Sequence, residues 1–292
     1  MIPVTELVTA LPTIVRTPRG VVECAWCGEG PAVLLLHGAM GGYDQGLMLA
    51  RGAVGQSGFR FVAVSRPGYL GTPLAVGELP EHQADMCAGV LDALDIRDAA
   101  VIAISGGGQC ALQFALRYPE RCRALVMISA CSAPIPGRLP LGFHVMKLAA
   151  RFPFLADRMR KKAAQNPEAS ARRSIPDPAL RARTLGDSES GPLLAELQQS
   201  TMCRMAERLP GTLNDIRQSR APFSYPVERI SAPSLIIHGT DDEAAPFAAS
   251  EALAARISGA ELLAIPGGRH VSLFTHREAI QLRVRRFLNT RE

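Results

Sequence analysis

The stretch that decides the fold is VIAISGGGQCALQFALRYPER, Val101–Arg121. An apolar run ends at Ser105, a run of glycines follows, and the apolar spacing then becomes that of a helix. This order predicts a strand, a tight turn and a helix, with the serine at the turn. Enzymes that attack acyl groups often hold their nucleophile at such a turn, in the pattern G-x-S-x-G. Ala103 and Gly107 stand at the two glycine positions, and both are small enough for the turn.

Short apolar runs bounded by turn residues recur along the chain and alternate with helical patterns. Several runs are continuously apolar, as expected of strands that are buried on both faces of a sheet. The expected strands are 20–27, 32–38, 59–65, 99–105, 123–130, 233–239 and 260–266, and the clearest helices are 81–94, 109–117, 247–257 and 277–288. The alternation predicts an α/β fold with a mostly parallel central sheet flanked by helices.

The alternation is interrupted once, because residues 134–226 contain helical and charged text but no convincing strand. Both ends of this segment attach to expected strands, so it is interpreted as a helical insertion. The predicted organisation is a core of residues 1–134 and 229–292 with a helical subdomain of residues 135–228 between its two parts.

Composition narrows the class of protein. The chain has 292 residues, 47% of them hydrophobic, which is enough for one large α/β domain. No apolar run is long enough to span a bilayer, and the first 20 residues lack the pattern of a secretory leader. Seven scattered cysteines suggest no disulfide framework, so a reducing cytoplasm is the expected location.

The net charge of +5 is concentrated in the insertion. Residues 135–227 hold 15 of the 32 basic side chains but only 8 of the 27 acidic ones. Aromatic residues make up only 5% of the chain, and no basic tail is present, so nucleic-acid binding is not expected. The excess indicates a solvated helical surface, or a surface that attracts an anionic substrate.

A serine nucleophile needs a general base and a group that orients the base. Asp241 and Asp242 follow the strand of residues 233–239, and His270 lies in a glycine loop after the strand of residues 260–266. The order serine, aspartate, histidine is the one found in hydrolases with this type of turn. The N–H groups of Ala39 and Gly106 are the expected donors to the oxyanion.

The remaining histidines and cysteines predict no metal or cofactor. His37 and His238 end strands and are expected to make structural hydrogen bonds, and no set of residues has the spacing of metal ligands. Cys24 and Cys27 fall within one expected strand, where they are interpreted as structural. The glycines of the Ser105 turn match neither of the common nucleotide-binding patterns.

Five segments together resemble the α/β-hydrolase superfamily over almost the whole chain. LLLHGAMGG is similar to its oxyanion loop, VAVSRPGYLGTP to the turn D-x-P-G-x-G-x-S, and ISGGGQCALQFALRYPER to its nucleophile elbow and helix. HGTDDEAAP is similar to the acid turn G-x-x-D-x-x-x-P, which selects Asp242 over Asp241, and IPGGRH to the histidine loop. The resemblance implies that the insertion is the family's helical cap.

This sequence departs from the family pattern at several positions. Ala103 replaces a glycine of the elbow, Ser65 replaces the common aspartate of the second segment, and Leu70 is an extra residue in that segment. Arg269 replaces the usual small residue before His270. A guanidinium beside this histidine would oppose its protonation if it pointed inward.

The resemblance implies hydrolysis of a carboxylic ester, lactone or thioester, with Ser105 as nucleophile, His270 as base and Asp242 as its orienting acid. A small ester-like substrate, anionic if the basic insertion attracts it, is the expected partner. The alternatives are carbon–carbon bond hydrolysis, acyl transfer to an acceptor other than water, and a receptor that no longer catalyses. Val271 follows His270 where carbon–carbon hydrolases often have tryptophan, which argues against the first alternative.

Overall fold

The computed structural model describes residues 10–135 and 141–290. Its centre is one eight-stranded sheet in the order β1-β2-β4-β3-β5-β6-β7-β8. Only the pairs β1–β2 and β2–β4 are antiparallel. The strands are β1 (Thr13–Thr17), β2 (Gly20–Cys27), β3 (Ala32–Leu36), β4 (Arg60–Val64), β5 (Ala99–Ile104), β6 (Cys122–Ile128), β7 (Ser234–Gly239) and β8 (Glu261–Ile265).

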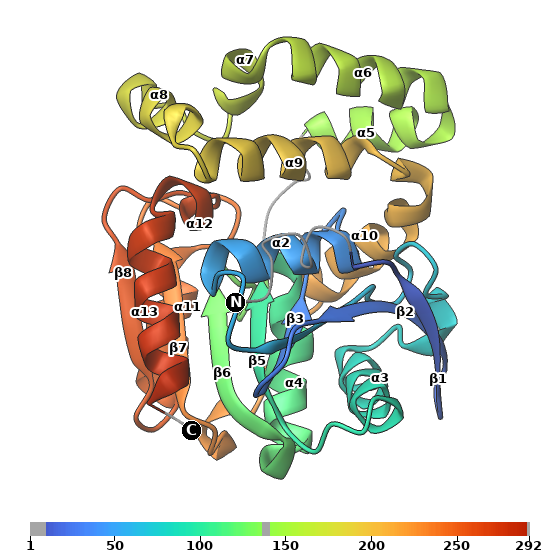
Figure 1. Cartoon of the computed structure of the whole chain (residues 1–292), viewed down its shortest axis with the longest axis vertical. Helices are drawn as coiled ribbons and strands as arrows, with labels where there is room; N and C mark the ends of the chain where they lie inside the picture. Colours follow the sequence, from blue (N-terminus) through green and yellow to red (C-terminus); the bar gives the residue numbers. More distant parts are fainter. Residues whose placement is uncertain (1–9, 136–140, 291–292) are drawn as a thin grey trace.

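Helices cover both faces of the sheet, which confirms the predicted α/β architecture (Figure 1). The four helices expected most clearly from the sequence form within a residue or two of their predicted bounds. The core helices are α2 (Tyr43–Ala53), α3 (Pro80–Ala93), α4 (Gly108–Arg117), α11 (Phe247–Arg256), α12 (Ser272–Thr275) and α13 (Arg277–Asn289). The strand β1 and the helix α2 were not expected.

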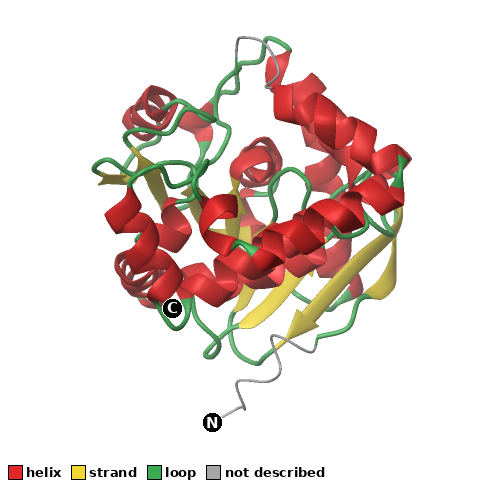
Figure 2. Cartoon of the chain, turned by 90° about the horizontal axis from the view of Figure 1, so that it is seen from above, coloured by secondary structure: helices red, strands yellow, loops and turns green. Residues whose placement is uncertain are grey.

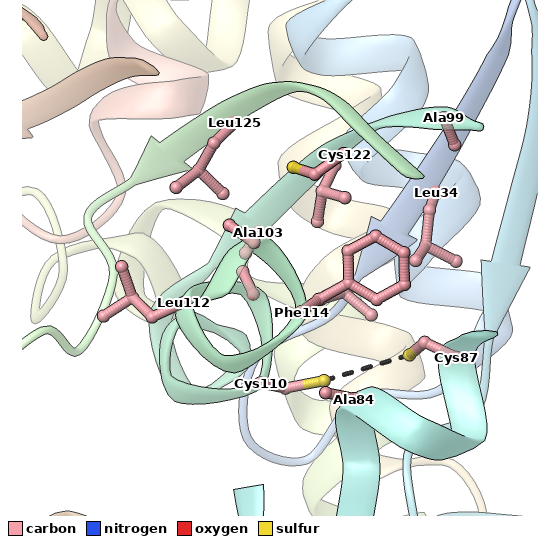
Figure 3. Close-up of a cluster of buried hydrophobic side chains, with 14 of the residues drawn as sticks. Leu34, Ala84, Cys87, Ala99, Ala103, Cys110, Leu112, Phe114, Cys122 and Leu125 are labelled. Atoms are coloured by element: carbon pink, nitrogen blue, oxygen red, sulfur yellow. Dashed lines mark hydrogen bonds between the residues drawn. The ribbon is translucent and has the colours of Figure 1, made fainter. Parts of the chain in front are cut away.

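The apolar strands bury their alternate residues in two different cores. Leu34 and Leu36 of β3 pack with α3, α4 and α11, whereas Val33 and Leu35 pack with α2 and α13. Figure 3 shows part of the first core, where Leu34 lies with side chains of α3 and α4. This two-sided burial explains why the central strands are apolar throughout.

Between β6 and β7 the described chain forms helices and no strand. They are α5 (Leu141–Arg151), α6 (Pro153–Gln165), α7 (Pro167–Ala171), α8 (Pro178–Gly186), α9 (Ser190–Met202) and α10 (Met205–Arg220). Residues 141–220, here called the helical layer, lie over the carboxyl ends of the parallel strands, and a view from above shows them spread across that end of the molecule (Figures 1 and 2). The subdomain boundaries 135 and 228 stay a prediction.

The helix α10 docks on the core through an interruption in its own backbone. Pro210 has no N–H, and Gly211 donates its N–H to the Gly68 carbonyl instead of to the preceding turn. The Glu207 carbonyl, freed in this way, accepts the N–H of Leu70. The extra residue Leu70 therefore serves to pair the core turn with α10.

Candidate active site

Ser105 lies at the sharp turn between β5 and α4. Its φ of 51° places it in the left-handed region, which is uncommon for a residue other than glycine. Its carbonyl accepts the N–H groups of Gly108 and Cys131, which hold the turn. Gly107 lies close to the backbone of β3. A Cβ added at this position would lie 2.6 Å from the Leu36 carbonyl oxygen.

Ser105, His270 and Asp242 come together at the carboxyl ends of β5, β8 and β7. Ser105 Oγ is 2.9 Å from His270 Nε2, and His270 Nδ1 is 2.8 Å from Asp242 Oδ2. An ionised carboxylate can only accept, so Nδ1 carries the proton and Nε2 is free to accept from the serine hydroxyl. The three residues thus have the geometry of a nucleophile, a base and an orienting acid.

The carboxylate of Asp242 is buried and fully satisfied. Its Oδ1 accepts the N–H groups of Ala244 and Ala245, and its Oδ2 faces His270 and the Nε2 of His238 at 3.1 Å. Burial alone would raise the pKa of this carboxyl, but the hydrogen bonds from His238 and His270 outweigh it and hold the pKa well below the ordinary value of aspartate. Asp242 is therefore charged at neutral pH.

Two other residues were open questions in the sequence. Asp241 is exposed and accepts the Thr240 hydroxyl, so it takes no part in the contact with His270. Arg269 forms an ion pair with the exposed Glu243, which directs its guanidinium away from His270. His238, expected to be structural, bonds the Ala245 carbonyl and Ser250 but also contacts Asp242 Oδ2, the same oxygen that faces His270.

The loop after β3 approaches Ser105 closely. A Cβ on Gly38 would lie 2.9 Å from the Ser105 Cβ, so only glycine fits there. The next N–H along the chain, that of Ala39, lies 3.4 Å from the position that a Cβ on Gly106 would occupy. The N–H groups of Ala39 and Gly106 make no hydrogen bond to the described protein and border the same cavity as Ser105.

His37 shapes this loop as a neutral ring. Its Nδ1 donates to the Gly38 carbonyl at 2.6 Å, and its Nε2 accepts the N–H of Arg66 at 3.0 Å. Burial and the charge of Arg66 lower the pKa of His37 well below its ordinary value. The ring therefore links the loop after β3 to the turn after β4 without carrying charge.

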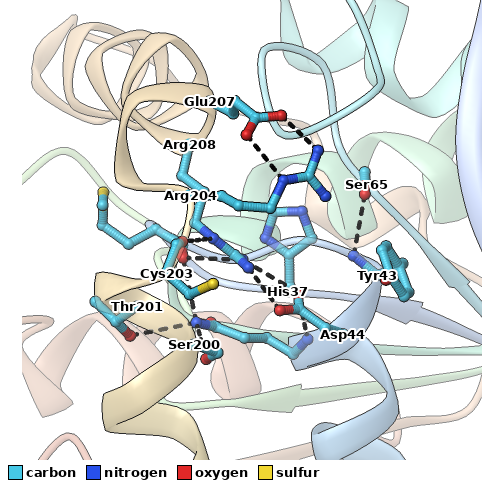
Figure 4. Close-up of polar contacts among 12 residues, drawn as sticks. His37, Tyr43, Asp44, Ser65, Ser200, Thr201, Cys203, Arg204, Glu207 and Arg208 are labelled. Atoms are coloured by element: carbon cyan, nitrogen blue, oxygen red, sulfur yellow. Dashed lines mark hydrogen bonds and ion pairs between the residues drawn. The ribbon is translucent and has the colours of Figure 1, made fainter. Parts of the chain in front are cut away.

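Residues of α10 brace the same loop from the helical layer. Thr212 Oγ1 accepts the N–H of Met40 at 2.9 Å, and Arg208 reaches the Met40 carbonyl while it pairs with Asp44. Met40 has a φ of 56°, so its backbone is held in an uncommon conformation from both sides. Figure 4 shows Arg208 between α10 and Asp44. Sequence reasoning gave these α10 residues no role.

Ser65 stands where the family turn has an aspartate, and a carboxylate from elsewhere in the chain takes the place of that aspartate. Ser65 donates to Glu23 Oε2 at 2.7 Å, and the same oxygen accepts the N–H of Gly71. Glu23 comes from β2, so a carboxylate still holds the turn although it arises elsewhere in the chain.

Two cavities meet at Ser105 and His270. The first, of ≈ 150 Å³, is here called the polar cavity because Arg66, Gln83, Gln109, Asp215 and Ser219 line it, although apolar side chains such as Pro80, Ile135 and Ile216 line it as well. The apolar cavity, of ≈ 300 Å³, is lined mainly by hydrophobic side chains, among them Met48, Leu49, Ile104, Leu197, Leu273 and Phe274. A bound molecule with one polar and one apolar end would place the bond between them at the serine.

Six basic residues of the insertion, which could have attracted an anionic substrate, do not line these two cavities. Lys161, Lys162, Arg172 and Arg173 are exposed, and neither they nor Arg158 and Arg160 line either cavity. In the described residues no three His, Cys, Asp or Glu side chains are placed to hold a metal ion. No helix of the described chain has the length and apolar character needed to cross a membrane.

The two hydrophobic cores include Cys24, Cys27, Cys87 and Cys110. Cys24 and Cys27 lie three residues apart on β2, so they point to opposite faces of the sheet and pack in different cores. Cys87 and Cys110 lie with their sulfurs 3.8 Å apart in the interior (Figure 3). The hydrogen bond with Cys110 and, after it, burial raise the pKa of Cys87 well above its ordinary value, so Cys87 is not an activated nucleophile.

With this fold and site described, comparison with known proteins defines the class. Residues 31–277 match the model of the alpha/beta hydrolase fold family, and the chain belongs to that family. The sequence resemblance stated above is thereby confirmed. Hydrolase activity is the coarse function that the family and its relatives support.

Particular relatives agree in fold and differ in what they act on. An alpha/beta hydrolase fold protein from Nakamurella multipartita is 33% identical, with a TM-score of 0.83 over 95% of this chain and 99% of that one. A 2-hydroxy-6-oxononadienedioate/2-hydroxy-6-oxononatrienedioate hydrolase of Burkholderia vietnamiensis is 26% identical over 88% of this chain and 86% of its own. A poly(3-hydroxyalkanoate) depolymerase of Ectopseudomonas oleovorans is 30% identical over 70% of this chain and 66% of its own.

Proposed function

We propose that the protein hydrolyses a carboxylic ester, lactone or thioester through an acyl-enzyme on Ser105. The observation that carries this proposal is the continuous hydrogen-bonded series from Ser105 Oγ through His270 to the buried Asp242 carboxylate. This series ends at a strained serine that borders two cavities. A structural glycine turn would require none of these partners.

In the first step Ser105 Oγ attacks the substrate carbonyl carbon, and its proton passes to His270 Nε2. Asp242 holds Nδ1–H and stabilises the positive charge that the ring acquires. The carbonyl oxygen becomes negative and accepts hydrogen bonds from the N–H groups of Ala39 and Gly106, a contribution of about 3 kcal/mol for each donor. His270 then returns the proton to the leaving oxygen or sulfur, whose bond to the carbonyl carbon breaks.

In the second step water releases the acid. His270 takes a proton from a water molecule, which attacks the acyl carbonyl carbon, and the proton then goes to Ser105 Oγ as its bond to that carbon breaks. The helical layer lies over this site and acts as the cap that shapes access to it. The mechanism uses only the chain's own residues and requires no cofactor.

The relatives support acyl chemistry. A poly(3-hydroxyalkanoate) is joined by ester bonds, and the depolymerase named above is 30% identical over 70% of this chain. The apolar cavity provides space for the hydrocarbon part of such an ester, and burial of this part supplies binding energy of about 25 cal/mol per Å².

The test is active-site labelling. A fluorophosphonate probe should label the wild-type protein and fail to label Ser105→Ala, and the purified enzyme should release phenol from phenyl acetate with an initial burst. Ser219→Ala is the matched control, because Ser219 lines the polar cavity and its hydroxyl donates to the Ile216 carbonyl rather than to Ser105 or His270. Equal labelling of wild type and Ser105→Ala would overturn the mechanism, and binding without turnover would indicate a receptor.

Carbon–carbon bond hydrolysis is a second candidate because of the Burkholderia vietnamiensis relative, whose named substrates are dioates. A dioate carries two carboxylates. Two features argue against this candidate. Arg66, the guanidinium that lines the polar cavity, is already paired with Asp215, and Val271 follows His270 where carbon–carbon hydrolases often have tryptophan. Release of an acid from a 2-hydroxy-6-oxo dienoate in the absence of ester turnover would favour this candidate over the first.

A further inference from the structure

The polar cavity contains a buried ion pair that the proposed mechanism does not use. Asp215 of α10 accepts from Arg66 with both carboxylate oxygens, at 2.8 and 2.5 Å, and from the Tyr69 hydroxyl at 2.6 Å. The side chain of Arg66 is 1% exposed and that of Asp215 is 10% exposed. Both residues line the cavity, and the carboxylate is the more exposed of the two.

Arg66 has almost no capacity left for a ligand. A guanidinium has five N–H groups. Four of them are committed, to the His37 carbonyl, to Gln83 Oε1 and to the two oxygens of Asp215. Burial would lower the pKa of Arg66, but the charge of Asp215 more than offsets it and raises that pKa, so the guanidinium stays charged.

The carboxylate is also close to the reacting atoms. A Cβ on Gly106 would lie 2.8 Å from Asp215 Oδ2 and 3.4 Å from Arg66 Nη2. An acyl group on Ser105 that extends into the polar cavity must pass this pair. In a cavity of ≈ 150 Å³ such a group cannot keep a hydration shell that would screen it.

Two glutamines supply unused donors on the same cavity wall. Gln83 and Gln109 are 3% and 6% exposed, and each gives its Oε1 to a neighbour, Arg66 and Tyr225 respectively. Neither side-chain nitrogen donates to the described protein. Neither nitrogen is among the fully enclosed polar atoms without a partner, so both remain accessible, and these donors suit a cavity ligand that brings an acceptor.

We propose that the polar cavity is a subsite for an uncharged hydrogen-bonding group of the substrate, such as a carboxamide or hydroxyl, and that Asp215 is the specificity-determining residue that excludes carboxylates. This assignment rests on the proposed function. The Gln83 and Gln109 amides donate to the acceptor of that group, and the remaining lone pair of Asp215 accepts its N–H or O–H. A substrate carboxylate would instead find the Arg66 guanidinium already paired and would meet Asp215 Oδ2, the nearer of the two charges to Gly106, as a like charge at short range.

The experiment compares isosteric substrates that differ only in charge. One pair places the group on the acyl side, the phenyl esters of adipic acid monoamide and of adipic acid. The other pair places it on the leaving group, 4-acetoxybenzamide and 4-acetoxybenzoate. In the wild type kcat/KM should favour the carboxamide by about tenfold or more in at least one pair. Wild-type ratios near one in both pairs would overturn the proposal.

The variant Asp215→Asn should reverse this preference, because it keeps the shape but leaves Arg66 with an unpaired charge. The kcat/KM of the carboxylate ester should rise at least tenfold relative to that of the carboxamide. Asp157→Asn is the matched control, since it removes one negative charge from the helical layer at a half-exposed site on α6. An equal change in both variants would identify a long-range charge effect and overturn the assignment.

A second variant covers the case in which Asp215→Asn does not fold. Gln109→Leu removes a donor and no charge, so it should lower kcat/KM for the carboxamide ester several-fold more than for phenyl acetate. An equal loss for both esters contradicts the subsite. Failure of the wild type to hydrolyse any ester or to react with fluorophosphonate overturns the proposed function itself, whereas an active wild type without charge preference overturns only the role of Asp215.

Discussion

The loops of the core and the helix α10 contribute to the site in different ways. Ser105, Asp242 and His270 follow strands of one sheet, so the fold places them at a common edge through rigid neighbours. In contrast, α10 belongs to the helical layer and reaches the site through Thr212 and Asp215, which contact the backbone of Met40 and the side chain of Arg66. Under the proposed function, the core supplies the bond-breaking groups, while α10 contacts the loop after β3 and contributes Asp215 to the lining of the polar cavity.

The largest effect is expected for Asp242, the buried aspartate of the core that faces His270. Asp242→Asn should lower kcat by about 10⁴-fold, because an asparagine amide donates to His270 Nδ1 and forces the proton onto Nε2, where it blocks acceptance from Ser105. Phenyl acetate turnover under saturating conditions measures the change.

Asp241→Asn is the control for this prediction, since Asp241 is the exposed neighbour that the sequence offered as an alternative acid. It should keep kcat within about twofold of the wild type. A greater loss in Asp241→Asn than in Asp242→Asn would reassign the acid and break the contrast between the core and α10.

The residues of the core could be predicted because their signals are local in the sequence. A nucleophile turn, an acid turn and a histidine loop each combine a strand end with glycines, so Ser105, Asp242 and His270 could be named before the structure. The four clearest core helices could be predicted for the same reason, since each has an apolar spacing of its own. The edge strand β1 is short and largely exposed, and it lacks such a signal.

The α10 contacts could not be predicted, because they join residues far apart in the chain. Asp215 meets Arg66 across 149 positions and Thr212 meets Met40 across 172. The Pro210–Gly211 pair was visible in the sequence only as a helix breaker, and its pairing with the turn at Leu70 depends on the packed helical layer. Charge counting in the insertion indicated a solvated surface or one that attracts an anion, whereas the charged side chains that line the polar cavity with His270 are the paired Arg66 and Asp215.

A smaller effect is expected for α10. Thr212→Val is nearly isosteric and leaves the buried N–H of Met40 without an acceptor, at a cost of about 1–3 kcal/mol. Part of this cost should appear as a shift of the loop that carries Ala39, so kcat should fall about tenfold with little change in KM. Steady-state kinetics on phenyl acetate separates the two constants.

The matched control is Thr184→Val, which replaces a threonine of α8 that is 3% exposed and bonds only the Leu180 carbonyl. It should destabilise the fold without a specific loss of kcat. If both valine variants lowered kcat to the same degree, α10 would have only a structural role. The contrast between the core and α10 would then not hold, because α10 would not specifically position the loop after β3.

The smallest effect is expected at Arg269, which precedes His270 and departs from the family pattern. Its guanidinium pairs with Glu243, and that partner is 79% exposed. Exposed ion pairs contribute at most about 1 kcal/mol, and salt screens their influence on neighbours. Arg269→Ala should therefore change kcat by less than about twofold and leave the pH profile of kcat/KM in place at 0.15 M ionic strength. A rise of the profile's acidic limb to higher pH in Arg269→Ala would show instead that this cation had been opposing protonation of His270, and the core's chemistry would then depend on a surface residue.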